Sequence, residues 1–348
     1  MAKGRTIYDI AREAGVSTAT VTRVTAGHPG VKAETRERVQ RVINQYAYIP
    51  SSIAQDLEQG HSRAIGVILP EVANPYYTRL FDAADAQARQ SGYAVHLLQL
   101  RAFGNDANAV VDELIRRRLD GVFFVGGISE SASDALIQAL KRLRTYMPIV
   151  AICSPLKDLD CICLYNDLNA CMRRAVRHLH VLGHRRIAFL GGSLDVDASG
   201  ARGQGFLEEI HALGLVDDHA YHHESGFDVQ SGERAVLKLL TGLDKARWPT
   251  ALIAFNDLVA LGAMKQLKQM GLKLPEDMAI IGCDDLFFSP YTDPPLTSMD
   301  LHPSEHARSA IQELLAAKDK NAAPYALMRD ATLVVRESCG AKLGYRKR

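Results

Sequence analysis

The chain has 348 residues, of which 47% are hydrophobic and 23% are charged, values typical of a globular protein with room for two or three domains. No apolar run approaches the roughly 18 residues that a transmembrane helix needs. The first residues also lack the apolar segment of a secretory signal. We therefore expect a cytoplasmic protein, associated with the nucleoid if it binds DNA, and no membrane partner.

Charge is distributed unevenly along the chain. The first 50 residues carry eight Lys and Arg side chains against four Asp and Glu, a net charge of +4, whereas the rest of the chain has a net charge of −3. A small basic head on a mildly acidic body is typical of a DNA-binding module attached to a second domain.

Residues 7–24 predict two short helices around a tight turn. The first helix has apolar residues at helical spacing, and Gly15 follows where the chain needs a residue that tolerates positive φ. Ser17 is a good N-cap for the second helix, whose Val21 and Val24 face inward. This is the pattern of a helix-turn-helix, in which the second helix enters the major groove of DNA. An ordinary αα-hairpin is the alternative.

A third helix is expected over residues 33–46, with one apolar face that closes a three-helix core. The chain then passes through residues 51–62, a short helical segment that stops at Gly60. Such a segment is too short to be stable alone in water, so we expect it to be ordered only when something holds it.

From Arg63 onward, apolar strands alternate with helices. The strands are expected at residues 64–70, 94–100, 121–125, 149–153, 186–190, 251–255 and 278–283. This alternation predicts parallel, doubly wound sheets. Because the pattern restarts after Tyr165, we expect two similar subdomains, with a ligand in the cleft that the carboxyl ends of their strands face.

The sequence offers no motif of metal or enzyme chemistry. The six cysteines form no CxxC pair and have no His at zinc spacing, so we expect buried, reduced thiols. They are Cys153, Cys161, Cys163, Cys171, Cys283 and Cys339. No nucleophile–base–acid set or Gly-rich phosphate loop is present, which predicts a protein without cofactor, metal or enzymatic activity. His178, His180 and His184 are interpreted as surface residues.

Motifs along the whole chain match one family in order. In the first part they are Tyr8-Asp9-Ile10-Ala11, Ala14-Gly15-Val16-Ser17, Thr20-Val21-Thr22-Arg23-Val24, Thr35-Arg36-Glu37-Arg38-Val39, Tyr48-Ile49-Pro50, Ile65-Gly66-Val67-Ile68 and Asn74-Pro75-Tyr76-Tyr77. In the second part they are His178-Leu179, Leu182-Gly183-His184-Arg185-Arg186-Ile187-Ala188, Arg202, Gly205-Phe206, Pro249-Thr250-Ala251, Phe255-Asn256-Asp257, Gly282-Cys283-Asp284-Asp285 and Pro294-Pro295-Leu296-Thr297-Ser298. With these motifs the chain resembles the lactose-repressor (LacI/GalR) family of transcriptional regulators.

The resemblance implies an α + α/β fold in three parts. Residues 1–50 would form a three-helix helix-turn-helix headpiece, 51–62 a hinge helix, and 63–348 a doubly wound body like that of periplasmic binding proteins, which binds the effector and dimerises. The body would divide into subdomain one, approximately 63–164 and 297–325, and subdomain two, approximately 165–296 and 326–340.

The resemblance also assigns DNA contacts to the headpiece. Residues placed at base edges are Thr18, Ala19, Thr22 and Arg23. Arg23 can make the bidentate contact to guanine, and its alternative is a solvated or phosphate-bound arginine. Residues that match backbone-positioning sites are Tyr8, Ser17 and Thr20. A plain cap or surface hydroxyl explains these three nearly as well.

In the hinge, Leu57 matches a leucine that enters the minor groove, where apolar wedges unstack a base step. Ala54 matches the small residue near it. Asp56 departs from the family pattern, because an acid close to phosphates weakens binding unless it caps or pairs locally. The alternative for Leu57 is packing on the body.

Six residues match the family's effector cleft. They are Tyr76, Tyr77, Arg202, Phe227, Asn256 and Asp284. Amide and carboxyl groups bind hydroxyls, an arginine forks onto oxygens, and an aromatic face packs on a sugar ring. Tyr77 is alternatively a core residue, and Asp257 and Asp285 are interpreted as local caps or surface acids.

Three positions depart from common family choices and bear on the chemistry of the effector pocket. Cys153 stands where many members have an acid, and Val125 and Leu301 fill positions that are polar in some. We therefore expect a pocket poorer in hydroxyl acceptors than a hexose site. Arg202 would equally suit the carboxylate of a sugar acid.

The resulting hypothesis is a ligand-responsive repressor that binds a palindromic DNA operator as a homodimer. We expect its effector to be a sugar, polyol or sugar acid and its target to be an operon for using such a compound. A solute-binding receptor of a transport system shares the body fold but not the basic head. An enzyme on a doubly wound fold is the third possibility. A DNA-retardation assay separates the first class from the other two.

Overall fold

The computed structural model describes residues 5–48, 62–99, 107–126, 134–155, 159–192, 197–217, 221–317 and 323–341. The chain divides into two compact units, residues 1–63 and 64–348, which are called the headpiece and the body below. Among the helices described, none is both long and apolar enough to span a lipid bilayer.

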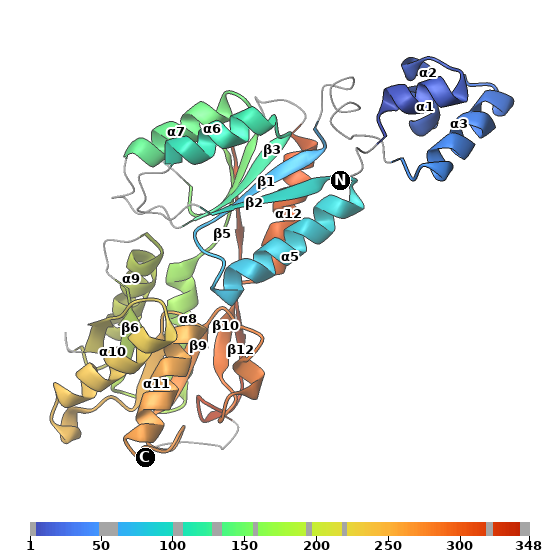
Figure 1. The fold of residues 1–348 in the computed structure, drawn as a ribbon. Coiled ribbons are helices and arrows are strands. Elements are labelled where there is room, and N and C mark those ends of the chain that lie inside the picture. Colours follow the sequence, from blue (N-terminus) through green and yellow to red (C-terminus); the bar gives the residue numbers. More distant parts are fainter. Residues whose placement is uncertain are drawn as a thin grey trace. The chain divides into compact units, whose positions relative to one another are not determined.

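The headpiece is a three-helix unit of α1 (Ile7–Ala14), α2 (Thr18–Thr25) and α3 (Ala33–Gln45) (Figure 1). Thr6 and Asp9 form a capping box at the start of α1, and Gly15 ends that helix with a φ of 63°. The side chain of Ser17 then caps α2 by accepting the amide of Thr20. The three helices bury one small core, which contains Ile10, Val21, Val24, Val39, Val42 and Ile43.

The first half of the body is built on a parallel six-stranded sheet. Its elements in chain order are β1 (Ala64–Leu69), α5 (Pro75–Gln90), β2 (Ala94–Gln99), α6 (Ala107–Arg117), β3 (Gly121–Val125), α7 (Asp134–Arg144), β4 (Ile149–Ile152) and β5 (Ile162–Asn166). The sheet order is β11-β5-β4-β3-β1-β2, where β11 (Ala326–Arg329) returns from near the C-terminus.

Helices cover both faces of this sheet. Residues of α6 and α7 pack with Ile68, Val122 and Phe124 in one core, and α5 and α12 (Pro303–Ala316) pack on the opposite face with Val67 and Phe123 (Figure 1). Because neighbouring residues of a strand point to opposite faces, strands buried on both sides read as continuous apolar runs.

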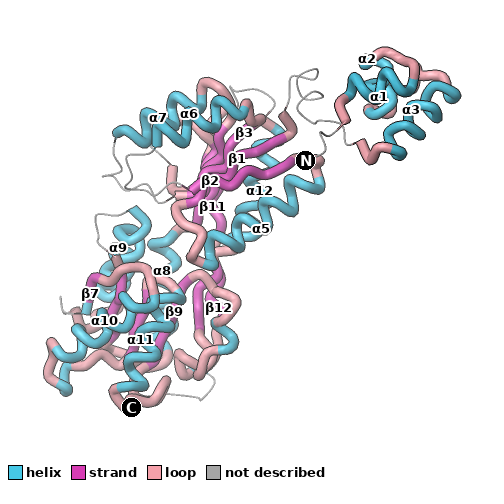
Figure 2. The backbone as a smooth tube through the Cα atoms, in the orientation of Figure 1, coloured by secondary structure: helices cyan, strands magenta, loops and turns pink. Residues whose placement is uncertain are grey.

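The second half of the body repeats this plan. Its elements are α8 (Leu168–Val181), β6 (Ile187–Gly191), α9 (Asp197–Ala212), β7 (His222–Glu224), α10 (Val229–Thr241), β8 (Ala251–Ala254), α11 (Asp257–Gln269), β9 (Ala279–Cys283), β10 (Thr297–Asp300) and β12 (Thr332–Val334), with 3₁₀ turns at Lys245–Arg247 and Ser289–Tyr291. The sheet order is β12-β10-β9-β8-β6-β7, and β12 alone of these strands runs antiparallel to its neighbour. Figure 2 shows the strands of this half in magenta among its cyan helices. Helices α8 and α9 pack on one face, and α10 and α11 on the other.

Two of the predicted subdomain assignments are wrong. Residues 297–300 form β10 of the second sheet, not part of the first, and residues 326–329 form β11 of the first sheet, beside β5. The chain therefore changes sheet after β5, between β10 and α12, and between β11 and β12. Short strands near these crossovers carry little local signal, because the sheet they join is decided by pairing with residues far away in sequence.

The cysteines and histidines were predicted from the sequence with mixed success. All six cysteines are buried, as expected. His184 is not a surface residue: it is 1% exposed, and its Nδ1 lies 2.9 Å from the hydroxyl oxygen of Thr250. Gly183, with a φ of 99°, folds the chain back after α8 and turns this imidazole into the protein.

Candidate functional site

Helix α2 presents one polar face away from the headpiece core. Val21 and Val24 are buried, whereas Ala19 and Arg23 are exposed and Thr18 and Thr22 are half-buried. At 100° per residue, Ala19, Thr22 and Arg23 fall on the side opposite the two valines. Three of the four predicted base-reading residues therefore share one accessible helix face, and Thr18 lies at its margin.

The hydroxyl groups on α2 are partly used within the helix. The hydroxyl of Thr22 donates to the carbonyl of Thr18 at 3.2 Å, which leaves its methyl group for an apolar contact such as that with thymine. Ser17 Oγ and Thr20 Oγ1 lie 2.9 Å apart at the start of the helix. Tyr8, on α1, is 70% exposed, so its phenol is accessible to a phosphate.

The predicted hinge residues Ala54, Asp56 and Leu57 lie outside the residues that the structure describes. Their roles remain predictions.

In the body, α5 begins at the predicted cleft. Asn74 caps the helix by accepting the amide of Tyr76 at 3.0 Å, and Pro75 occupies its first position. Tyr76 and Tyr77 therefore lie in the first turn, with ring centroids 5.4 Å apart in an edge-to-face arrangement. Tyr76 packs both with the first sheet's core and with Cys171, Cys283 and Met299 of the second half.

Arg202 lies on α9 and is 4% exposed. Its guanidinium carbon stands 4.2 Å from the centre of the Phe255 ring, and one terminal nitrogen donates to Cys283 Sγ at 3.5 Å. Its Nε is buried and has no hydrogen-bond partner among the described residues. A buried donor without a partner is costly, which makes this group a good contact for an acceptor on a ligand.

Asp284 directly follows β9, is 6% exposed and has a φ of 106°. Burial, then the nearby Cys283, raises the pKa of its carboxyl group well above the ordinary range, while Arg202 opposes this shift. Burial and then Asp284 raise the pKa of the Tyr76 phenol, and the same two causes raise that of Tyr77 to about 12. Tyr76, Arg202 and Asp284 are thus close enough for their charges to interact.

Phe227 and Asn256 form a second part of the site. Asn256 caps α11 by accepting the amide of Val259 at 2.8 Å, and its Nδ2 donates to the carbonyl of Phe227 at 2.9 Å. Phe227 is 41% exposed, and its ring lies 4.9 Å from that of Phe255. Both polar atoms of the Asn256 side chain therefore hold the local backbone, and Phe255 links the exposed ring of Phe227 to Arg202.

Two carboxyl groups were interpreted incorrectly from the sequence. Asp257 is fully buried and accepts hydrogen bonds from the amide of Leu286 and the hydroxyls of Ser289 and Ser298. The carboxylate of Asp285 accepts a hydrogen bond from Arg336 Nη1, with 2.6 Å between nitrogen and oxygen. Neither is a surface acid. Phe255 and Cys283 contact Arg202 but were not predicted as site residues. An apolar strand end does not indicate which groups it faces.

The three positions of the body that depart from the family pattern are buried. Val125, Cys153 and Leu301 are 4%, 9% and 4% exposed.

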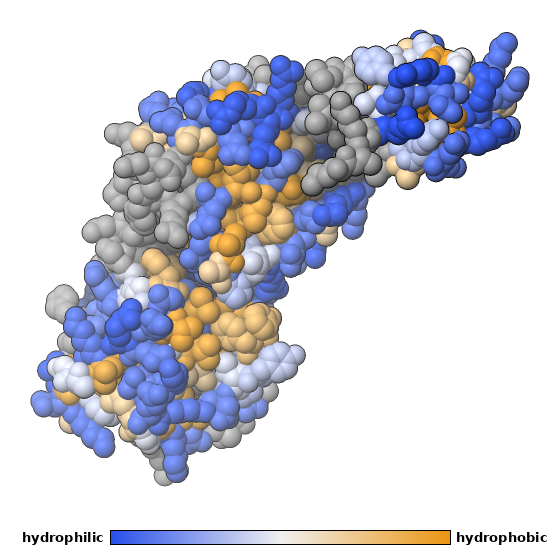
Figure 3. Space-filling view, viewed as in Figure 1, coloured by the Kyte–Doolittle hydropathy of each residue, from blue (hydrophilic) through white to orange (hydrophobic). Residues whose placement is uncertain are grey.

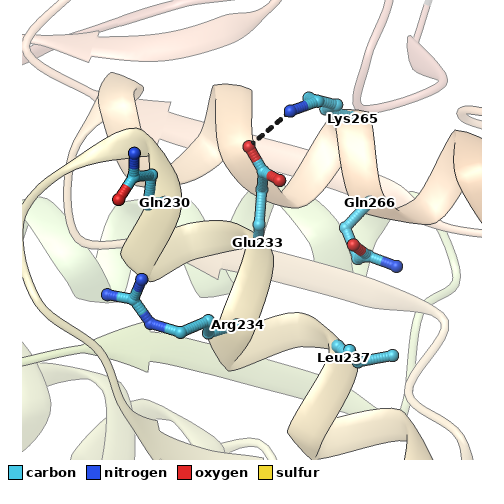
Figure 4. A pocket seen from close by; sticks show the side chains of 6 residues that line it. All are labelled: Gln230, Glu233, Arg234, Leu237, Lys265 and Gln266. Atoms are coloured by element: carbon cyan, nitrogen blue, oxygen red, sulfur yellow. Dashed lines mark hydrogen bonds and ion pairs between the residues drawn. The ribbon is translucent and has the colours of Figure 1, made fainter.

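A separate open pocket lies between α10 and α11 (Figure 4). It is lined by Gln230, Glu233, Arg234, Leu237, Lys265 and Gln266, and none of the predicted site residues is among them. Glu233 and Lys265 pair across it at 2.8 Å.

Comparison with known proteins identifies the family. Residues 6–51 match the bacterial regulatory proteins of the lacI family, and residues 176–339 match the periplasmic binding protein-like domain. The chain is 30% identical over 338 residues to the HTH-type transcriptional repressor PurR of Haemophilus influenzae, an alignment that covers 96% of this chain and 98% of the relative. The chain belongs to the lacI family of bacterial regulatory proteins.

Other lacI-family proteins extend this likeness over the full chain. The HTH-type transcriptional repressor CytR of Escherichia coli is 29% identical over 97% of this chain and 96% of its own. The structure of the lac repressor dimer bound to operator and the anti-inducer ONPF is similar with a TM-score of 0.86 at 27% identity, covering 97% and 99% of the two chains. The regulator CelR in complex with cellobiose has a TM-score of 0.71 at 27% identity, covering 96% and 99%. The predicted family and fold class are confirmed.

Proposed function

We propose that this lacI-family protein is a ligand-responsive, sequence-specific DNA-binding repressor that acts as a homodimer on a palindromic operator. The observation that carries this proposal is the likeness of nearly the whole chain to a lac repressor dimer bound to operator. The relatives are transcriptional regulators rather than enzymes, and they support a protein that works in the cytoplasm on the nucleoid.

Three segments of the chain carry the separate parts of this function. Residues 1–50 read DNA, residues 51–62 form the hinge, and residues 63–348 bind the effector and dimerise. In the headpiece, the polar face of α2 enters the major groove, with Thr18, Ala19, Thr22 and Arg23 at base edges. Contacts to the DNA backbone come from Tyr8, Ser17 and Thr20. In the hinge, Leu57 enters the minor groove beside Ala54.

The effector binds where Tyr76, Arg202 and Asp284 meet. The Nε of buried Arg202, which has no hydrogen-bond partner among the described residues, and the raised pKa of Asp284 support this location. They offer a donor and a carboxyl group able to hold a proton. Phe227 supplies an exposed ring, with Tyr77 and Asn256 beside the site. The relative CelR binds cellobiose. We propose a sugar, polyol or sugar acid as the effector, and an operon for its use as the target.

Dimerisation fits the distribution of apolar side chains. Figure 3 shows them gathered on one visible face of the body, over β2 and α5 and again near β9 and β10. Leu97 is 42% exposed, Phe287 73% and Tyr291 84%. Exposed aromatic and aliphatic groups of this size are typical of interfaces, and a two-fold dimer places two headpieces on two half-sites.

Selection from a pool of randomised DNA duplexes tests the DNA-binding part. The protein should enrich a palindrome with two half-sites, and light scattering at micromolar concentration should give the mass of a dimer. Recovery of no preferred sequence would reject the proposal. A thermal-shift screen with glucose, cellobiose, sorbitol and gluconate tests the effector class, because a compound that binds the folded state raises the melting temperature.

A further inference from the structure

The turn that carries Asp284 is held in an unfavourable conformation. Asp284 and Asp285 are consecutive non-glycine residues with positive φ, 106° and 46°. Side chains other than glycine disfavour this region, so such a turn persists only where its surroundings fix it. The contacts that fix it therefore decide where the Asp284 carboxyl group points.

Several of these contacts come from the second half of the body itself. The amide of Asp284 donates to the carbonyl of Met299 at 2.8 Å, and the amide of Asp285 donates to Ser298 Oγ at 3.0 Å. Arg336 donates to the Asp285 carboxylate at 2.6 Å. Because all of these partners lie in or beside the second sheet, these contacts move with the turn when the two halves of the body move.

One further contact reaches the turn from the first half. Arg79 lies on α5, three residues after Tyr76, and its Nη1 donates to the carbonyl oxygen of Asp285 at 3.2 Å. The same nitrogen lies 3.9 Å from the carboxylate of Asp300, the last residue of β10. Arg79 therefore bridges the helix that carries Tyr76 and the turn that carries Asp284.

We propose that Arg79 is a positioning residue for effector binding, which couples the arrangement of the two halves of the body to the conformation of the Asp284–Asp285 turn. This inference rests on the proposed effector site. If the two halves of the body move against each other, the hydrogen bond from Arg79 to Asp285 exists in one arrangement of the halves and is lost in another. When the halves separate, the turn loses its restraint from α5, and Asp284 is held less firmly for the effector.

A surface ion pair without this role is the competing explanation. The Arg79 side chain is 39% exposed, and exposed ion pairs contribute little to stability. Removing Arg79 should therefore leave the melting temperature nearly unchanged under either explanation. Only if Arg79 positions the Asp284–Asp285 turn should its removal alter the conformation of that turn.

Hydrogen–deuterium exchange on the full chain separates the two explanations without any ligand. The amides of Asp284, Asp285 and Leu286 are all hydrogen-bonded, so their exchange reports on the turn. In Arg79→Met we expect them to exchange about fivefold faster or more. Arg89→Met is the matched control, since Arg89 lies on the same helix and pairs with Asp85 of that helix at 2.6 Å. Arg79→Lys keeps a donor and should restore slow exchange in large part.

Unchanged exchange at these amides in Arg79→Met would overturn the inference, as would faster exchange throughout the body or equal behaviour of Arg89→Met. The glucose, cellobiose, sorbitol and gluconate screen gives a second measurement. A compound that stabilises the parent should need a several-fold higher concentration with Arg79→Met, and equal concentrations would contradict the inference. If no compound stabilises the parent, the proposed effector class fails, while the exchange experiment still decides the role of Arg79.

Discussion

Asp257 shows how strongly burial changes a single carboxyl group. The residue is fully buried at the start of α11 and accepts three hydrogen bonds, from Leu286, Ser289 and Ser298. Burial raises its pKa from 3.8 to about 6, although the two serine hydroxyls and the amide oppose the shift. These bonds join α11 to the loop after β9 and to β10, which places Asp257 close to the Asp284–Asp285 turn.

This raised pKa predicts a pH dependence of stability. Between about pH 4 and pH 6 the folded state holds a proton on Asp257 that the unfolded state has lost, so the free energy of unfolding falls as the pH rises. The free energy of unfolding falls by at most about 3 kcal/mol through this group, and the fall is complete above about pH 6. Urea unfolding of the parent and of Asp257→Asn should show it as a difference in slope, because both proteins retain the contribution of Asp284 and only the parent has that of Asp257. Asp293→Asn, at an exposed carboxylate, is the control, and parallel curves for parent and Asp257→Asn would contradict the prediction.

At Arg23 the prediction concerns DNA specificity. The side chain is exposed on the polar face of α2. If it reads guanine, Arg23→Ala should cost roughly 1–3 kcal/mol in binding free energy per half-site and relax the preference at one base pair. Binding to the selected palindrome and to its single-base variants measures both effects. Arg41→Ala, at an exposed residue of α3, is the control. Equal loss on specific and random duplexes would make Arg23 a phosphate contact instead.

The sequence predicted some of the residues that the structure brings together at the candidate site, and it missed others. Tyr76, Arg202 and Asp284 were found through motifs, and the structure brings them together. The contacts of Asp257 and Arg79 were not predicted, because a charged side chain is interpreted as a surface residue until its partners are known. Those partners lie tens or hundreds of positions away, as the bond from Arg79 to Asp285 illustrates.

Among the elements, the pair α10 and α11 depends on two glycines. A Cβ atom at Gly232 would stand 2.1 Å from the carbonyl oxygen of Val259, and one at Gly262 would stand 1.9 Å from that of Val229. The backbones of the two helices therefore approach more closely than any side chain allows. The long central strands and helices of the body were predictable from their apolar runs and periodicity, but this approach was not, because it depends on which helices are neighbours.

Gly262→Ala should therefore destabilise the body. The added methyl group meets backbone rather than a flexible side chain, so we expect a loss of about 1–3 kcal/mol in the free energy of unfolding, as for other overpacked sites. Urea denaturation measures the loss. Gln266→Ala, one turn later on the same helix and at the open pocket, should change stability by about 0.5 kcal/mol or less. Equal stability of Gly262→Ala and the parent would show that the helices can separate at little cost.

Across the whole molecule, the chain passes three times between the two halves of the body, after β5, between β10 and α12, and between β11 and β12. The headpiece precedes β1 in the chain, so it is covalently connected to the first half. Asp284 belongs to the second half. A ligand that favours one arrangement of the halves therefore has a covalent route to DNA binding, and it changes DNA affinity only as far as it prefers that arrangement.

Asp284→Ala tests this coupling. The substitution should remove the response to an effector while leaving the affinity of the ligand-free protein for its palindrome nearly unchanged, because Asp284 lies outside the headpiece.

Thermodynamic linkage adds a stricter condition: the factor by which an effector changes DNA affinity must equal the factor by which DNA changes effector affinity. Titrations of the parent and of Asp284→Ala with the palindrome, with and without a compound that stabilises the parent, measure both factors. Asp293→Ala should behave as the parent does. A variant at Asp284 that responds at the parent's effector concentrations would show that the effector site lies elsewhere.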